Sequence, residues 1–75
     1  NSKILVQYKQ HIRGEDILEM SDYLKKINVK VLGITKEEVE KTALFTVRLK
    51  KNTKVSDILL NLASNEKIER VRKED

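Results

Sequence analysis

The spacing of apolar residues switches between strand and helix periodicity along this chain, and that order restricts the fold more than any other feature. Residues 3–9 alternate in character, which predicts a strand with Ile4, Val6 and Tyr8 on one face. In residues 15–26 the apolar positions recur every three or four residues, which is typical of one face of a helix. That predicted stripe consists of Ile17, Met20, Leu24 and Ile27.

The middle of the chain predicts two more strands joined by a hairpin. Residues 29–36 are rich in β-branched and aliphatic side chains, and Gly33 within them indicates a bulge or a close backbone approach. Residues 42–50 alternate apolar and polar side chains cleanly. The link at residues 37–41 is short and charged, so we expect these two strands to pair as neighbours.

The last third predicts a helix and then a strand. Ser56 is the expected N-cap, with Val55 packing against Leu60 as a hydrophobic staple. The expected buried stripe is Ile58, Leu59, Leu62 and Ala63. Residues 67–72 form a short, weakly patterned strand around Ile68 and Val71.

The resulting order, strand-helix-strand-strand-helix-strand, predicts an α+β fold of the ferredoxin-like βαββαβ type. Such a fold has a four-stranded antiparallel sheet with both helices on one face. Residues 1–75 suffice for one domain. Because the chain starts at Asn1 and not at methionine, we expect a piece excised from a larger protein.

Composition argues against catalysis, cofactors and nucleic acid. The formal charge is +4, but the 16 basic and 12 acidic residues are interleaved, whereas a phosphate-binding surface gathers its positive charge on one face. There is no cysteine, and His11 alone cannot make a metal site. The acidic run Glu37, Glu38 and Glu40 is expected to be a solvated turn. His11, Ser56, Ser64 and the acidic residues form no local nucleophile–base pattern. We therefore predict no enzyme activity, no metal and no cofactor.

Residues 11–18, following the strand around Val6, resemble the corresponding segment of the ACT domain. That family typically has an acidic residue, then Pro-Gly, then a helix that opens with aliphatic residues. Gly14 stands at the position of the family's glycine, while His11 replaces the acidic residue and Arg13 the proline. Residues 55–62, with Ile68 and Val71 after them, are similar to the family's second helix and last strand.

The resemblance implies a ligand-binding loop, because the family's glycine lets the backbone approach a small ligand or a partner subunit. The residues expected to bind a ligand are His11, Arg13, Gly14 and Glu15. Among ACT-like domains, the chain is most similar to the cytosolic C-terminal domain of the MgtC/SapB family, bacterial membrane proteins linked to magnesium limitation. This implies a regulatory domain in the cytoplasm, tethered to the inner membrane by the membrane domain of its parent protein.

Two alternatives remain open from the residues. The domain could instead be an amino-acid-binding ACT module of a metabolic enzyme or a transcription factor, which a full-length reading frame would distinguish. It could also pair as a homodimer through the open face of its sheet, where Leu5 and Leu44 are expected, together with Leu32 or Ile34 depending on a bulge at Gly33.

Overall fold

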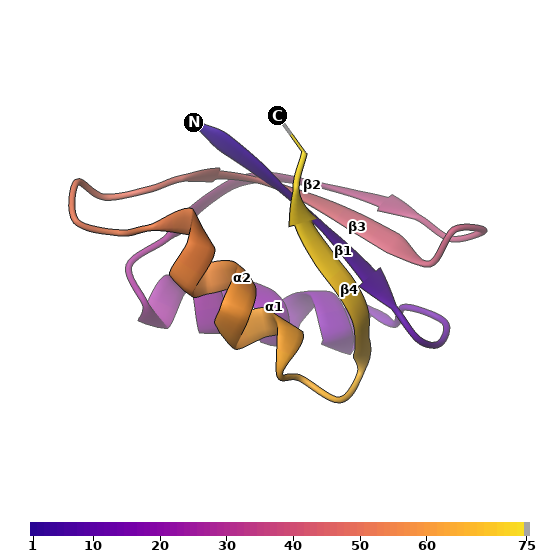
Figure 1. Ribbon diagram of the computed structural model, residues 1–75. Coiled ribbons are helices and arrows are strands. Elements are labelled where there is room, and N and C mark those ends of the chain that lie inside the picture. The colour runs from indigo at the N-terminus through magenta and orange to yellow at the C-terminus, as the bar shows by residue number, and fades with distance from the viewer. Residues whose placement is uncertain (75) are drawn as a thin grey trace.

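The computed structural model describes residues 1–74, and they form a four-stranded antiparallel sheet covered on one face by two helices (Figure 1). The elements are β1 (Ser2–Tyr8), α1 (Gly14–Lys26), β2 (Lys30–Glu37), β3 (Thr42–Arg48), α2 (Val55–Ala63) and β4 (Ile68–Lys73). The strand order across the sheet is β2-β3-β1-β4. This arrangement confirms the predicted ferredoxin-like α+β fold.

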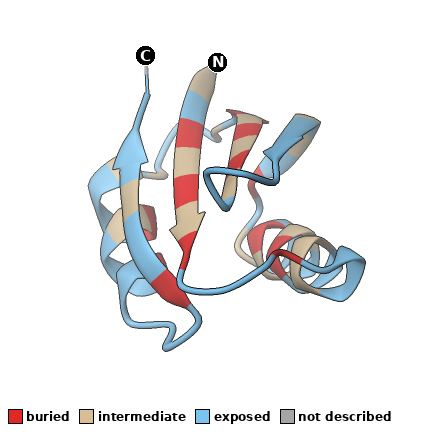
Figure 2. Cartoon of the chain, turned by 90° about the vertical axis from the view of Figure 1, so that its right-hand side faces the viewer, coloured by how far each residue is buried: buried red, intermediate tan, exposed pale blue. Residues whose placement is uncertain are grey.

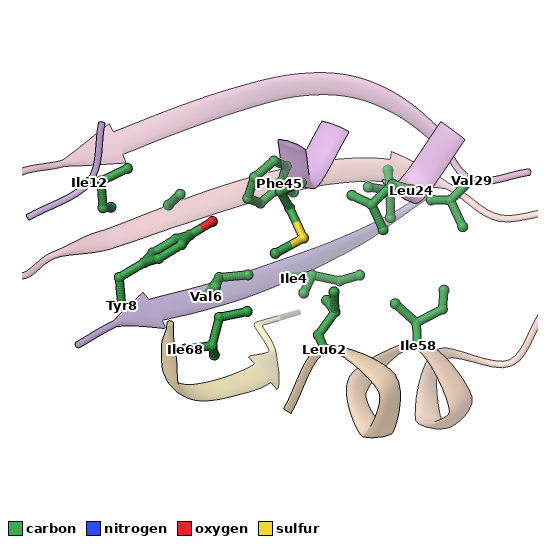
Figure 3. Packing of buried hydrophobic residues seen from close by; sticks show 13 residues of the cluster. Ile4, Val6, Tyr8, Ile12, Leu24, Val29, Phe45, Ile58, Leu62 and Ile68 are labelled. Atoms are coloured by element: carbon green, nitrogen blue, oxygen red, sulfur yellow. The ribbon is translucent and has the colours of Figure 1, made fainter. Parts of the chain in front are cut away.

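One hydrophobic core fills the space between the sheet and the helices. Ile4 and Phe45 from the two central strands are fully buried and lie opposite each other in the sheet. Leu24 of α1 and Leu62 of α2 close the core from the other side (Figure 3). Burial alternates along β1 (Figure 2), so the predicted faces of this strand are confirmed.

A Schellman motif ends α1 and turns the chain into β2. The N–H of Val29 donates to the carbonyl of Leu24 at 2.8 Å, and the N–H of Asn28 donates to that of Lys25 at 3.0 Å. Asn28 has φ of 64°, the left-handed region that this motif requires and that asparagine tolerates better than most residues. Because Val29 is itself buried, the motif also fixes where β2 begins relative to the core.

The bulge expected at Gly33 is present and decides which side chain of β2 faces which way. The register with β3 shifts between Val31 and Gly33, so Leu32 is the additional residue. Beyond the bulge, Ile34 lies opposite Phe45 and therefore on the helix-covered face. Of the two alternatives left by the sequence, Ile34 is therefore not the residue on the open face.

The predicted start of the second helix is wrong by two residues. The N-cap is Lys54, in an extended conformation and without a side-chain hydrogen bond, and Ser56 lies within the first turn. Leu60 is 74% exposed, so no hydrophobic staple forms with Val55. Ala63 is also exposed, whereas Ile58 and Leu62 are buried as predicted. The helix is held by these two core contacts rather than by its cap.

Candidate ligand-binding cleft

A cleft of about 520 Å³ opens at the loop that connects the end of β1 to the start of α1. Its walls are the loop of residues 9–13, the first turn of α1 and the turn between α2 and β4. These segments are far apart in the sequence but meet at one end of the molecule (Figure 1). The N–H of Lys9 donates to the carbonyl of Lys67 at 3.0 Å, which joins the two loops directly. The cleft is therefore a product of the sheet pairing between β1 and β4.

The lining of the cleft mixes charges of both signs. Its basic side chains are Lys9, Arg13 and Lys67, and its acidic side chains are Glu15, Asp16 and Glu66. Tyr8, Gln10 and His11 add groups that donate or accept hydrogen bonds. A lining of this kind suits a ligand that carries both charges better than a simple anion or cation.

The first turn of α1 is organised by Asp16. Its Oδ2 accepts a hydrogen bond from the N–H of Arg13 at 2.8 Å, which is half of a capping box. The side chain of Arg13 has no hydrogen-bond acceptor, so the second hydrogen bond of a capping box cannot form. Its guanidinium group instead lies 3.6 Å from the carboxylate of Glu15 in an exposed ion pair. The backbone amide of Arg13, followed by the ammonium of Lys67, holds the pKa of Asp16 below its usual value. Asp16 is thus a permanently charged carboxylate at neutral pH.

Lys67 links the α2–β4 turn to α1. Its Nζ lies 3.4 Å from Oδ1 of Asp16 and 3.5 Å from Oε2 of Glu19. The backbone beneath it is set by Asn65, whose Oδ1 accepts from the N–H of Lys67 at 2.9 Å. The hydrogen bond to Asp16 is the largest cause of the raised pKa of Lys67. Because the lysine side chain remains half exposed, it can move toward a ligand at little cost.

Tyr8 is the most unusual residue of the cleft. It is only 5% exposed, and its hydroxyl group is buried without a hydrogen-bond partner in the described part of the chain. Figure 3 shows the ring at the end of β1 beside Val6, with the oxygen directed inward. Burial, and then the carboxylates of Asp16 and Glu19, raise the pKa of Tyr8 to about 12. The hydroxyl group is therefore a neutral donor, and an unpaired one costs roughly 1–3 kcal/mol.

The same tyrosine also lines a second, smaller hollow of about 210 Å³ between α1 and α2. This hollow shares Asp16 and Lys67 with the larger cleft and adds Asn61 and Tyr23. The ring of Tyr8 therefore stands between two hollows that have the Asp16–Lys67 ion pair in common.

The structure brings together three of the four residues predicted to bind a ligand. His11, Arg13 and Glu15 line the cleft, whereas Gly14 begins α1 beside it and does not line it. Gly14 is not in the left-handed region, and a Cβ added there would meet no atom within 4 Å. The fold itself therefore does not require glycine at this position.

Sequence reasoning missed Asp16 and Lys67 and assigned Tyr8 to the core. The burial of Tyr8 is confirmed, but the sequence could not show that its hydroxyl group lacks a partner. Asp16 could have been found, because it stands three residues after the N-cap position Arg13. Lys67 had no sequence signal, since its partner Asp16 is 51 residues away.

Among residues 1–74, no group of three or more His, Asp or Glu side chains is arranged to hold a metal ion. No helix in that part of the chain is long and apolar enough to cross a membrane. Comparisons with family models, with curated proteins and with solved structures found no match. The ACT-like and MgtC/SapB resemblances therefore stay predictions made from the residues.

Proposed function

We propose that this domain is a non-catalytic regulatory module whose cleft beside Tyr8 binds a small zwitterionic ligand. The unpaired hydroxyl group of Tyr8 is the observation that carries the proposal. A buried polar group without a partner is uncommon in folded proteins, and a ligand that accepts its hydrogen bond after the ring of Tyr8 turns toward the cleft would remove the cost. The volume of about 520 Å³ lies within the range of small-molecule sites.

The charges of the cleft favour a ligand with one ammonium and one carboxylate group. The carboxylates of Glu15 and Asp16 suit the ammonium, and the side chains of Arg13 and Lys67 suit the carboxylate. A free amino acid is the simplest compound with both groups. By binding both residues 9–13 and the α2–β4 turn, it would stiffen two loops that the hydrogen bond from Lys9 to Lys67 already joins.

The surroundings of Gly14 also support ligand binding at the start of α1. The fold leaves open space where its side chain would be, so glycine is unnecessary for packing or for backbone conformation. A ligand or partner that comes close to the backbone at the start of α1 would explain why glycine occupies this position. The N-terminal end of a helix is also a favourable place for the carboxylate of such a ligand.

We further propose that the domain is the cytosolic C-terminal domain of an MgtC/SapB-type membrane protein linked to magnesium homeostasis. The resemblance of residues 11–18 and 55–62 supports this context. The second candidate, an amino-acid-binding module of a metabolic enzyme or a transcription factor, is favoured by the mixed charges of the cleft. Hydrophobic spans upstream in the full-length reading frame would support the first context, and a catalytic or DNA-binding domain there would support the second.

Titration of the protein with free amino acids at millimolar concentration, followed by amide NMR spectra, tests the ligand proposal. The amides of Arg13, Gly14, Glu15 and Lys67 should shift first and saturate together with at least one amino acid. N-acetylated and amidated forms of that amino acid, which each lack one charge, should bind at least about tenfold more weakly. Absence of any saturable shift across the common amino acids would contradict the proposal.

Two variants separate binding from folding. Gly14→Ala should leave the thermal midpoint unchanged or raise it, because the added methyl group meets nothing, yet it should weaken binding. Lys26→Ala changes an exposed residue at the far end of α1 and serves as the matched control, with binding unchanged. Equal binding by wild type and Gly14→Ala would remove the argument for backbone approach at this position.

A further inference from the structure

The fold gathers positive charge at the end of the molecule that lies opposite the ligand cleft (Figure 1). At this end α1 finishes, β2 starts, and β3 leads into the loop of residues 49–54. We call this surface the basic end, and its exposed side chains are Lys25, Lys26, Lys30, Arg48, Lys50 and Lys51. Acidic residues separate these side chains along the sequence, but the strand register places Lys30 directly opposite Arg48. The charges that are interleaved in the sequence are therefore sorted by the fold.

Few carboxylates belong to the segments that form the basic end. Among residues 1–74, the acidic side chains in the last two turns of α1 and the first turn of α2 are Asp22 and Asp57. Glu74 also lies at this end of the sheet, where it pairs with Arg72 at 3.1 Å. The acidic residues 37–40 are at the opposite end, where β2 turns into β3. No ion pair within the described residues includes a side chain of the basic end, so its positive charge stays largely uncompensated.

A hollow of about 410 Å³ opens on the basic end between α1 and the start of β2. Lys25, Lys30 and Lys50 line it from three different segments, together with Ser21. Of the lining residues in the described part of the chain, Asp22 alone is acidic. Lysine ammonium and serine hydroxyl groups donate hydrogen bonds to phosphate oxygens. The hollow therefore suits the phosphate group of an anionic ligand.

We infer that the basic end docks on the anionic surface of a lipid bilayer, with the phosphate group of one lipid in the hollow. Clustered basic residues are attracted to a negatively charged leaflet when they come within about one Debye length of it. The loop of residues 49–54 projects from the body of the domain (Figure 1), so Lys50 and Lys51 reach the headgroups first. The ligand cleft, at the other end of the molecule, then faces away from the bilayer.

A nucleic acid is a poorer occupant of the basic end. Single strands are bound by stacking their bases on aromatic side chains. Tyr8 and Phe45 are instead buried in the core, and Tyr23 packs against the core from α1. Arginine is the residue best suited to nucleic-acid recognition, and Arg48 is the one arginine among the side chains of the basic end. Lysine carries a compact charge on a flexible stem, which suits a fluid layer of headgroups.

The start of β1 lies at the same end of the sheet. Ser2 is opposite Val47, beside the position where Arg48 ends β3. In the membrane-tethered context proposed above, the segment before Asn1 would therefore leave the domain on the side that faces the bilayer. Only this geometrical point rests on the proposed function, because the charge distribution does not depend on it.

The attraction is weak and depends on salt. Each Lys or Arg near an anionic bilayer strengthens binding about fivefold. With about four side chains at the surface at once, half-saturation is expected at about 1 mM accessible lipid. The molecule is 34 Å long, more than three times the Debye length of about 10 Å at about 0.1 M salt. Charges at the cleft end therefore contribute little to docking.

Cosedimentation with lipid vesicles tests this docking. Wild type should bind vesicles of phosphatidylcholine with about one third phosphatidylglycerol, should be released at about 1 M salt, and should not bind phosphatidylcholine alone. Lys30→Gln combined with Lys50→Gln removes positive charge from the basic end and should weaken binding at least about tenfold. Lys36→Gln combined with Arg70→Gln removes the same charge from the far end of the sheet. This matched control should change binding by less than about twofold.

Thermal unfolding of both double variants checks that the substitutions leave the fold intact. Wild type that fails to bind the anionic vesicles, or that binds neutral vesicles equally well, would overturn the inference. So would equal weakening by the two double variants. Binding of DNA or RNA through Lys30 and Lys50, without vesicle binding, would assign the basic end to a nucleic acid and overturn docking on a bilayer. None of these measurements depends on the ligand cleft or on membrane spans in the full-length protein, so their failure is distinguishable from that of the proposed function.

Discussion

Replacement of Tyr8 by phenylalanine should stabilise the protein while weakening its ligand binding. The substitution removes only the buried, unpaired hydroxyl group and keeps the ring. An unsatisfied buried group of this kind costs roughly 1–3 kcal/mol. The substitution leaves a void of one oxygen, on the order of 10 Å³, which at ~24 cal/mol per Å³ lowers the stability gained by only about 0.2 kcal/mol. We therefore expect a net gain of about 1–3 kcal/mol.

The stability gained by Tyr8→Phe should increase at high pH, where the tyrosine of the wild-type protein ionises. The pKa of Tyr8 is raised from 10.0 to about 12 in the folded protein. Its neutral form is therefore favoured by folding, and this contribution is fully present below pH 10 and is lost as the pH rises from 10 to 12. Phenylalanine does not titrate, so the advantage of Tyr8→Phe should increase across this interval.

Urea denaturation at neutral pH, and then between pH 10 and pH 12, measures both effects. At neutral pH the thermal midpoint should rise by about 4–8 °C for each kcal/mol gained. Tyr23→Phe, which removes the hydroxyl group of a residue on α1, is the matched control for tyrosine titration. A Tyr8→Phe protein less stable than wild type would show that the hydroxyl group has a partner and would refute the reasoning.

Three further predictions concern the fold and the first turn of α1. Phe45→Ala removes the largest fully buried side chain and should cost roughly 3–5 kcal/mol, enough to unfold so small a domain; a melting midpoint close to that of wild type would contradict the core assignment. Asn28→Gly should raise stability by a few tenths to about 1 kcal/mol in urea denaturation, and Asn28→Ala should lower it by about 1 kcal/mol, because φ is 64° there. The lowered pKa of Asp16 gives a stabilisation that is present above its unfolded pKa near 4 and is lost as the pH falls through the lower folded value. Between about pH 5 and pH 2, wild type should accordingly lose more stability than Asp16→Asn, and parallel curves would contradict this.

The elements that the sequence predicted best are those whose pattern directly reflects burial. Ile4 and Val6 on β1, and Met20 and Leu24 on α1, are buried as their spacing indicated. The start of α2 was predicted less well, because Ser56 has the side chain of an N-cap but Lys54 occupies that position. A cap contributes only about 1 kcal/mol, so the packing of Ile58 and Leu62 against the sheet decides where the helix begins.

The residues of the candidate cleft likewise include some that the sequence predicted and some that it could not predict. The sequence predicted His11, Arg13 and Glu15, which are close together along the chain and remain together in the fold. It could not predict Lys67, which reaches Asp16 only because β4 pairs with β1. Nor could a period-two pattern show that Tyr8 buries a hydroxyl group without a partner.

By itself, then, the sequence determined the order of elements and the faces they bury, because these depend on local periodicity and on the hydrophobic effect. The tertiary structure alone decided which loops meet at the cleft and which charges share the open face. Arg70 and Glu37 lie in one row because three strand pairings have a particular register, including a bulge at Gly33. A shift of one residue in any of these pairings would move side chains to the opposite face, and local patterns do not encode that long-range alignment.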